Sequence, residues 1–223
     1  YHNPTGFSYS NSQKKEILKL AEQYGVFIVE DDYLADLEVD QKAETLHTLG
    51  NKDRIVYIRS FSKTLLPGLR LGMAVIPESL QKQFLDLKKS MDLNTSILTQ
   101  AALEIFLKSN MYRFHVKRTK EHYKNKMSKL REYCKQTQGF GTWHIPQTGP
   151  YAYLETGGIS SQLLERNLLD SKVLVSSTNQ SYLNGFEHSE GLRLCVCNAE
   201  DHEIERAVRI IETLMHNRYS FNS

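Results

Sequence analysis

The stretch "YIRSFSKTLLPGLRLG", residues 57–72, carries the features that decide the fold. It starts as a β-type run, and this run ends by presenting Ser60, Ser62 and Lys63 together. A proline-glycine break follows, and then Arg70 stands between two leucines. Ligands of an open parallel sheet collect at the carboxyl ends of its strands. The stretch therefore predicts a strand that delivers a lysine, two hydroxyls and an arginine to a ligand site.

The residues around this stretch alternate between helical and strand patterns. A helix is predicted over residues 10–25, with Ser10 or Ser12 as its cap and Gly25 at its end. Short apolar runs bounded by turns or acids are typical of buried parallel strands. Three such runs are present: "VFIVEDDY", "RIVYIRS" and "RLGMAVIP". This order predicts an α/β layer, with helices over a mostly parallel sheet.

The second half of the chain has a different organisation. The pattern is helical from Glu78 to about Arg131 and includes a long polar amphipathic stretch at residues 109–134. Short strands and helices then alternate to the end, as in a small α+β domain. We therefore predict part of a large domain at residues 1–110, and a small C-terminal domain with a long bridging helix at residues 111–223. Aromatic residues of this small domain are expected in its core: Trp143, Tyr151 and Tyr153.

Composition excludes several classes of protein. The 223 residues are 24% charged and 40% hydrophobic, which is ordinary for a globular protein. The net charge of +2 is too small to indicate a nucleic-acid surface. The three cysteines have no metal-binding spacing, His115 and His122 fit a polar helix face, and no metal site is predicted. No apolar run approaches the ~20 residues of a membrane helix. We expect a reduced, cytoplasmic location.

Polar residues follow three predicted strand ends or turns, and together they match one cofactor. A lysine such as Lys63 can form a Schiff base with an aldehyde cofactor. A phosphate can sit among Ser60, Ser62 and Arg70. These groups correspond to the aldehyde and the phosphate of pyridoxal phosphate.

The remaining groups of pyridoxal phosphate also have candidate partners. The pyridinium nitrogen needs a carboxylate that keeps it protonated, and Asp31 or Asp32 could supply one. The ring's phenolic oxygen can accept hydrogen bonds from an amide and a phenol, here Asn3 and Tyr33.

The motif series "NPTG … EDDY … SFSK … GLRLG … GLRLC" resembles that of fold-type I aminotransferases of class I/II, in the same order along essentially the whole chain. The resemblance implies pyridoxal 5'-phosphate as cofactor and a homodimer with its sites at the interface. It implies that Lys63 is the Schiff-base lysine and that Arg193 grips a substrate α-carboxylate. The implied cofactor contacts are Asn3, Asp31, Tyr33, Ser60, Ser62, Lys63 and Arg70.

The spacing between the acids and the tyrosine in "EDDY" indicates which branch of these proteins the chain resembles. Many aminotransferases place the tyrosine three residues after the aspartate, and here that position is Glu30. The spacing resembles instead the aminotransferase-like domain of MocR-type regulators of the GntR family, in which the aspartate two before the tyrosine meets the pyridine nitrogen. Residues two apart on a strand face the same side, so we choose Asp31 over Asp32.

Two functions remain open at this point. The first is the effector domain of a transcriptional regulator that senses pyridoxal phosphate, or an amine or amino acid, through the Lys63 aldimine. The alternative is a pyridoxal phosphate-dependent aminotransferase acting on an amino acid. The chain opens with "YHNPTG", so we expect it to start within a longer protein whose earlier part includes the phosphate-cupping helix start. In a regulator, DNA would be bound only by an N-terminal domain that this sequence lacks. A third possibility is that the chain has no activity by itself.

Overall fold

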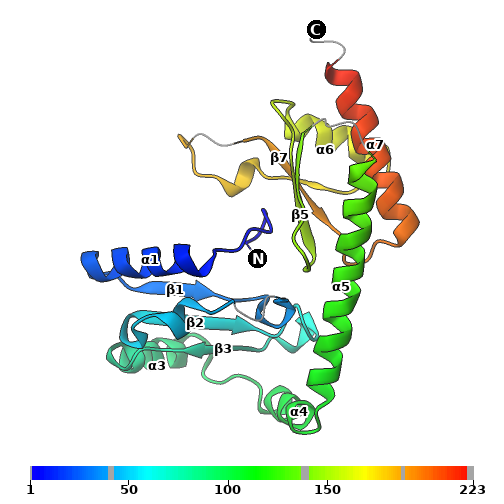
Figure 1. Cartoon of the computed structure of the whole chain (residues 1–223). Coiled ribbons are helices and arrows are strands. Elements are labelled where there is room, and N and C mark those ends of the chain that lie inside the picture. Colours follow the sequence, from blue (N-terminus) through cyan, green and yellow to red (C-terminus); the bar gives the residue numbers. More distant parts are fainter. Residues whose placement is uncertain (1, 40–42, 137–140, 187–188, 220–223) are drawn as a thin grey trace. The chain divides into compact units, whose positions relative to one another are not determined.

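The computed structural model describes residues 2–39, 43–136, 141–186 and 189–219, and all the predicted site residues lie within these ranges. Figure 1 shows the course of the chain, which divides into two compact units. The first unit is Tyr9–Lys120, and the second combines Tyr1–Ser8 with Glu121–Ser223. The domain boundary that we placed at residue 110 stays a prediction. No described helix is both long and apolar enough to cross a bilayer.

The first unit opens with helix α1 (Asn11–Tyr24), whose ends are fixed by local chemistry. Ser10 accepts a hydrogen bond from the backbone of Gln13, and the Gln13 side chain accepts one from the backbone of Ser10. This reciprocal capping box satisfies two N–H groups that a helix start leaves open. Gly25 ends the helix with a left-handed backbone, φ 65°. The prediction of a helix between Ser10 and Gly25 is confirmed.

Three strands form the sheet of the first unit: β1 (Ile28–Asp31), β2 (Ile55–Ser60) and β3 (Gly72–Val75). They lie in the order β1-β2-β3, as Figure 1 shows. Strands β1 and β2 are parallel, as the sequence predicted, but β3 runs antiparallel to β2. A parallel return needs a crossover of a dozen or more residues, usually a helix. Residues 61–71 form only a short loop with one 3-10 helix, η3 (Pro67–Leu69).

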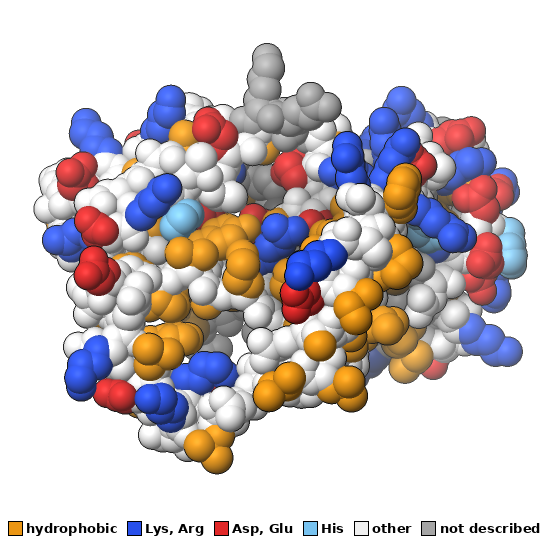
Figure 2. Space-filling model, turned by 90° about the horizontal axis from the view of Figure 1, so that it is seen from below, with side chains coloured by type: hydrophobic (Ala, Val, Ile, Leu, Met, Phe, Trp, Pro, Cys, Tyr) orange, Lys and Arg blue, Asp and Glu red, His pale blue; other side chains and the backbone are white. Residues whose placement is uncertain are grey.

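The remaining elements of this unit are helical. They are the 3-10 helices η1 (Ala35–Leu37) and η2 (Lys52–Arg54), the short helix α2 (Leu46–Leu49), the helices α3 (Glu78–Asp92) and α4 (Ile97–Lys108), and the first part of α5 (Met111–Lys135). Neither α3 nor α4 has a buried residue. Figure 2 shows hydrophobic side chains in patches between charged ones on the face it views. Exposed large apolar residues on α3 and α4 are Phe84, Leu85, Leu87, Met91, Ile97, Leu98, Ile105 and Leu107.

The second unit holds an antiparallel sheet of four strands in the order β4-β5-β7-β6. The strands are β4 (Thr142–His144), β5 (Tyr151–Glu155), β6 (Ser176–Ser177) and β7 (Gly191–Cys195). Its helical elements are the later part of α5, α6 (Ser161–Asp170), the 3-10 helix η4 (Asn179–Ser181) and α7 (Asp201–Tyr219). These elements agree with the strands and helices that the sequence predicted for this region.

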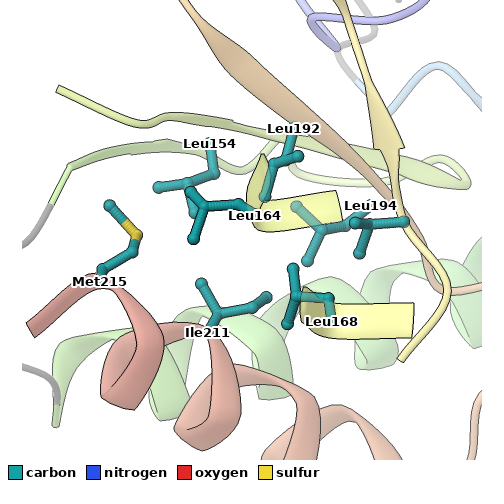
Figure 3. Packing of buried hydrophobic residues seen from close by; sticks show 8 residues of the cluster. Leu154, Leu164, Leu168, Leu192, Leu194, Ile211 and Met215 are labelled. Atoms are coloured by element: carbon teal, nitrogen blue, oxygen red, sulfur yellow. The ribbon is translucent and has the colours of Figure 1, made fainter. Parts of the chain in front are cut away.

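The main core of the second unit lies between its sheet and helices α6 and α7. Figure 3 shows Leu154 and Leu192 of the sheet meeting Leu164 of α6 and Ile211 of α7. The single tryptophan, Trp143, is partly buried and packs against this cluster, while Tyr153 is buried, in line with the predicted core role of both aromatics. A second cluster joins α5 to the sheet and α7 through Met127, Leu130, Ala152, Val196, Ile204 and Val208.

Candidate functional site

The loop after β2 turns its polar residues outward because apolar and hydroxyl neighbours anchor it. Phe61 and Thr64 are buried, at 9% and 1% exposure, while Lys63 between them is exposed. A turn closes the loop, since Leu65 N–H donates to Phe61 O at 2.8 Å. Ser62 N–H donates to Ser60 Oγ at 3.2 Å, which orients the Ser60 hydroxyl. The fold thus presents Lys63 at the end of β2.

The strand registers bring further predicted residues to the same edge of the sheet. Asp31 at the end of β1 pairs with Ile58, and Asp32 N–H donates to Ile58 O at 2.8 Å. On the other side, Ser60 pairs with Gly72, so Arg70 lies in the return loop close to this pair. Arg70 has a left-handed backbone with φ 50°, an uncommon conformation for a residue with a side chain.

The three acids of "EDDY" have different surroundings. Glu30 caps helix α2, accepting from Leu46 N at 2.7 Å and from His47 N at 2.9 Å. Asp32 accepts a hydrogen bond from the Tyr57 hydroxyl at 3.0 Å. Burial raises the pKa of Asp32, and this hydrogen bond offsets part of the rise. Asp31 is exposed, and its carboxylate has no hydrogen bond or ion pair with any side chain that the structure describes.

A half-buried cluster of polar side chains supports the backbone of this loop. Asp36 pairs with Arg59 of β2 and accepts a hydrogen bond from the Tyr112 hydroxyl. Thr64 donates to Asp36 Oδ2 at 3.3 Å, and the His115 ring contacts the carbonyl oxygen of Thr64. Since Thr64 follows Lys63 directly, the cluster fixes the backbone on which Lys63 stands. Sequence reasoning named neither Asp36 nor Tyr112. The one signal that could have indicated this cluster was Arg59, a charged residue within an otherwise apolar strand, which needs a polar partner.

The second unit brings Asn3 and Arg193 together. Arg193 Nη1 donates to Asn3 Oδ1 at 3.1 Å, and Arg193 Nη2 donates to Ser176 Oγ at 3.3 Å. The guanidinium also lies over the ring of Tyr151, 5.1 Å from its centroid. Sequence reasoning assigned Tyr151 to the core and gave Ser176 no role. Here both hold the guanidinium of Arg193 in place.

The predicted site residues therefore gather in two groups. The first unit holds the larger group at the ends of β1 and β2: Asp31, Tyr33, Ser60, Ser62, Lys63 and Arg70. The second unit holds Asn3 and Arg193 in direct contact. Within the described ranges no cluster of three or more His, Cys, Asp or Glu side chains could hold a metal ion. The larger group offers an amine, a guanidinium, hydroxyls, a phenol and a carboxylate at one sheet edge.

Comparison with curated proteins gives a bacterial regulator as a relative. The chain is 35% identical over 218 residues to "Uncharacterized HTH-type transcriptional regulator YcxD" of Bacillus subtilis. That alignment covers 95% of the chain but 49% of the regulator. The chain thus spans about half the length of this relative.

Comparison with solved structures gives enzymes of one fold. A kynurenine aminotransferase of Pyrococcus horikoshii matches with a TM-score of 0.90 at 22% identity, over 97% of the chain and 54% of the enzyme. The α-aminoadipate aminotransferase LysN of Thermus thermophilus, complexed with N-(5'-phosphopyridoxyl)-L-leucine, matches with a TM-score of 0.86 at 26% identity. That match covers 98% of the chain and 57% of LysN. Both similarities agree with the fold-type I architecture expected from the motifs.

The family model described as "Aminotransferase class I and II" matches residues 1–211. This match includes both groups of site residues and nearly all the elements described above. This match, together with the fold that the chain shares with the two enzymes, shows that the chain belongs to the class I and II aminotransferase family.

Proposed function

We propose that the chain is the pyridoxal phosphate-binding, aminotransferase-like effector domain of a MocR/GntR-type transcriptional regulator. It senses pyridoxal phosphate, or an amine or amino acid, through Lys63. The observation that carries the proposal is the exposed Lys63 between two buried anchors, at the sheet edge that also holds Asp31 and Arg70. The relative named as an HTH-type regulator supports the regulatory half of the proposal.

The chemistry of the donor set fits the cofactor. Lys63 supplies an amine for the aldehyde, and Arg70 with the two serines supplies charge and hydrogen bonds for the phosphate. Among "EDDY", Glu30 and Asp32 already have partners within the fold, so Asp31 is the carboxylate available to a ring nitrogen. When bound, pyridoxal phosphate supplies an electron sink for bonds at the carbon that carries an amino group.

Each residue then has a role. Asp31 would keep the ring nitrogen protonated, and Tyr33 and Asn3 are the proposed donors to the phenolic oxygen of the ring. Arg193, held by Ser176 and Tyr151, offers a planar fork of donors to the α-carboxylate of an amino acid. Lys63 would supply the amine that binds the cofactor's aldehyde, and as a free amine it could move a proton at the substrate carbon that carries the amino group. The protein would act as a homodimer in the cytoplasm, and DNA would be bound by a domain outside this sequence.

The test locates the covalent attachment. The purified intact protein, of which this chain is expected to be a part, is incubated with pyridoxal phosphate, reduced with borohydride, digested and mapped by mass spectrometry. We expect one phosphopyridoxyl label, on Lys63, because this lysine follows the strand end and has an exposed side chain. A label on another lysine, or the absence of any label, would contradict the proposal.

A second candidate function is amino-acid transamination. The contact between Asn3 and Arg193 favours it, because it links a proposed cofactor contact to a proposed carboxylate contact. Given an amino acid together with a second 2-keto acid that accepts the amino group, an enzyme should form the new keto acid over many turnovers, whereas a sensing domain should stop at one turnover or fewer. The gene sequence before the codon of Tyr1 separates the two independently, since a winged helix-turn-helix there indicates a regulator.

The two neighbouring aspartates should respond differently to substitution. Asp31→Asn is expected to weaken pyridoxal phosphate binding by about 10- to 150-fold, the equivalent of ~1.5–3 kcal/mol for a charge-assisted hydrogen bond. Asp32→Asn, the matched control, should change cofactor affinity much less because Asp32 is engaged with Tyr57. Cofactor titrations followed by absorbance would measure both. Equal effects would refute the assignment of Asp31.

A further inference from the structure

Two cysteines at the end of β7 lie in direct contact. Cys195 is the last residue of the strand, and its thiol donates to Cys197 Sγ across 3.2 Å. Val196 between them is buried in the second core cluster, so the alternation of the chain turns both cysteines to the other side. Neither cysteine is in a disulfide, and Cys195 is exposed. Neither has a part in the proposed cofactor chemistry.

The surroundings favour negative charge on Cys197. Its Sγ accepts two hydrogen bonds, one from the Cys195 thiol and one from the Tyr123 hydroxyl at 3.4 Å. Lys126 holds the backbone here, donating to the carbonyl oxygens of Val196 and Cys197 at 3.0 and 2.9 Å. The hydrogen bond to Cys197, followed by burial, raises the pKa of Cys195. Cys195 is the hydrogen-bond donor of the pair, and Cys197, whose sulfur accepts both hydrogen bonds, is the one placed to act as the nucleophile.

We propose that Cys195 and Cys197 form a reversible intramolecular disulfide when the protein meets a small-molecule disulfide such as oxidised glutathione. In a disulfide the two sulfur atoms lie ~2.05 Å apart. The sulfurs of Cys195 and Cys197 are already within 3.2 Å of each other, so a small movement of the two side chains would allow the bond to form. In a reducing compartment such bonds are transient and regulatory. The bond would form on the face of β7 that also carries Arg193, two residues away.

The reaction is a pair of thiol–disulfide exchanges. The Cys197 thiolate attacks one sulfur of the small disulfide, whose S–S bond breaks and releases one thiolate. Cys195 then loses its proton and attacks the Cys197 sulfur of the mixed disulfide, which releases the second thiolate. The protons of the two cysteines end on the two released thiols. The cysteines are oxidised and the small disulfide is reduced to two thiols.

The experiment counts thiols and needs no cofactor, so its outcome is independent of the proposed function. The purified protein is treated with oxidised glutathione under native conditions, quenched with acid, denatured and alkylated for mass analysis. We expect two of the three cysteines to lose their thiols without an attached glutathione, and dithiothreitol to restore both. The bond should lie within the tryptic peptide of residues 194–206, which contains both cysteines.

Variants make the result decisive. In the Cys195→Ser variant the reaction should stop at a stable glutathione adduct on Cys197, because no neighbouring thiol is present to displace the glutathione. Cys134→Ser is the matched control and should behave as the wild type, since Cys134 packs against the core and burial raises its pKa to about 12. Three unreacted thiols, a lasting glutathione adduct on the wild type, or disulfides only between molecules would each overturn the proposal.

Discussion

Lys63→Ala is expected to reduce covalent retention of pyridoxal phosphate to background. The aldehyde of the cofactor needs a primary amine, and Lys63 is the lysine that the fold presents at the carboxyl end of β2. Other lysines are available for slow, random reaction, but none stands in the loop anchored by Phe61 and Thr64. The measurement is the absorbance of the phosphopyridoxyl group per protein after borohydride reduction and desalting.

A matched variant tests whether the loss is specific. Lys82 lies on the surface of α3 with a side chain 88% exposed, paired with Asp86 one turn along the helix. Lys82→Ala removes an equal amine from the same unit and should leave retention at the wild-type value. If Lys63→Ala kept its label, or if both variants lost the label equally, Lys63 would not be the attachment point.

Ile211→Ala is expected to lower the free energy of unfolding of the second unit by about 3 kcal/mol, within the 2–5 kcal/mol range for such truncations. Ile211 is completely buried and meets leucines of the sheet and of α6, so its removal leaves a cavity among them (Figure 3). The single tryptophan, Trp143, packs against the same cluster and reports on this unit. Urea unfolding followed by tryptophan fluorescence would measure the change.

The control for this core prediction is an exposed leucine of the same unit. Leu174 is 83% exposed, so Leu174→Ala removes the same kind of side chain without opening a cavity. Its effect should stay within about 0.5 kcal/mol. Coincident unfolding curves for Ile211→Ala and the wild type would show that the cluster around Ile211 does not hold the unit together.

Local signals made much of the fold predictable. Ser10 and Gly25 mark the ends of α1 because a cap and a left-handed glycine act within a few residues. The strand ends bearing Asp31 and Lys63 were predictable for the same reason, since an apolar run and the polar residues after it are adjacent in sequence. The fold-type I architecture was implied by the resemblance to aminotransferases that the order of these motifs carries.

Contacts between distant residues were not predictable from one sequence. Asp36 and Tyr112 are 76 positions apart, and neither belongs to a sequence motif that would predict the hydrogen bond between them. Glu30 stands at the position where many aminotransferases have the aspartate, but its carboxylate caps α2, a helix of four residues that is too short for a periodic pattern. Such features arise from tertiary packing, which a single sequence does not display.

The contact between Asn3 and Arg193 joins residues 190 positions apart, within a unit assembled from both ends of the chain. At a synthesis rate of about 5–20 residues per second, roughly 10–40 s therefore pass between the synthesis of Asn3 and the synthesis of Arg193. The first unit is complete well before that, because all of Tyr9–Lys120 has already been made. The order of translation thus separates the two groups of site residues in time, because every residue of the Lys63 loop is made before Arg193 is.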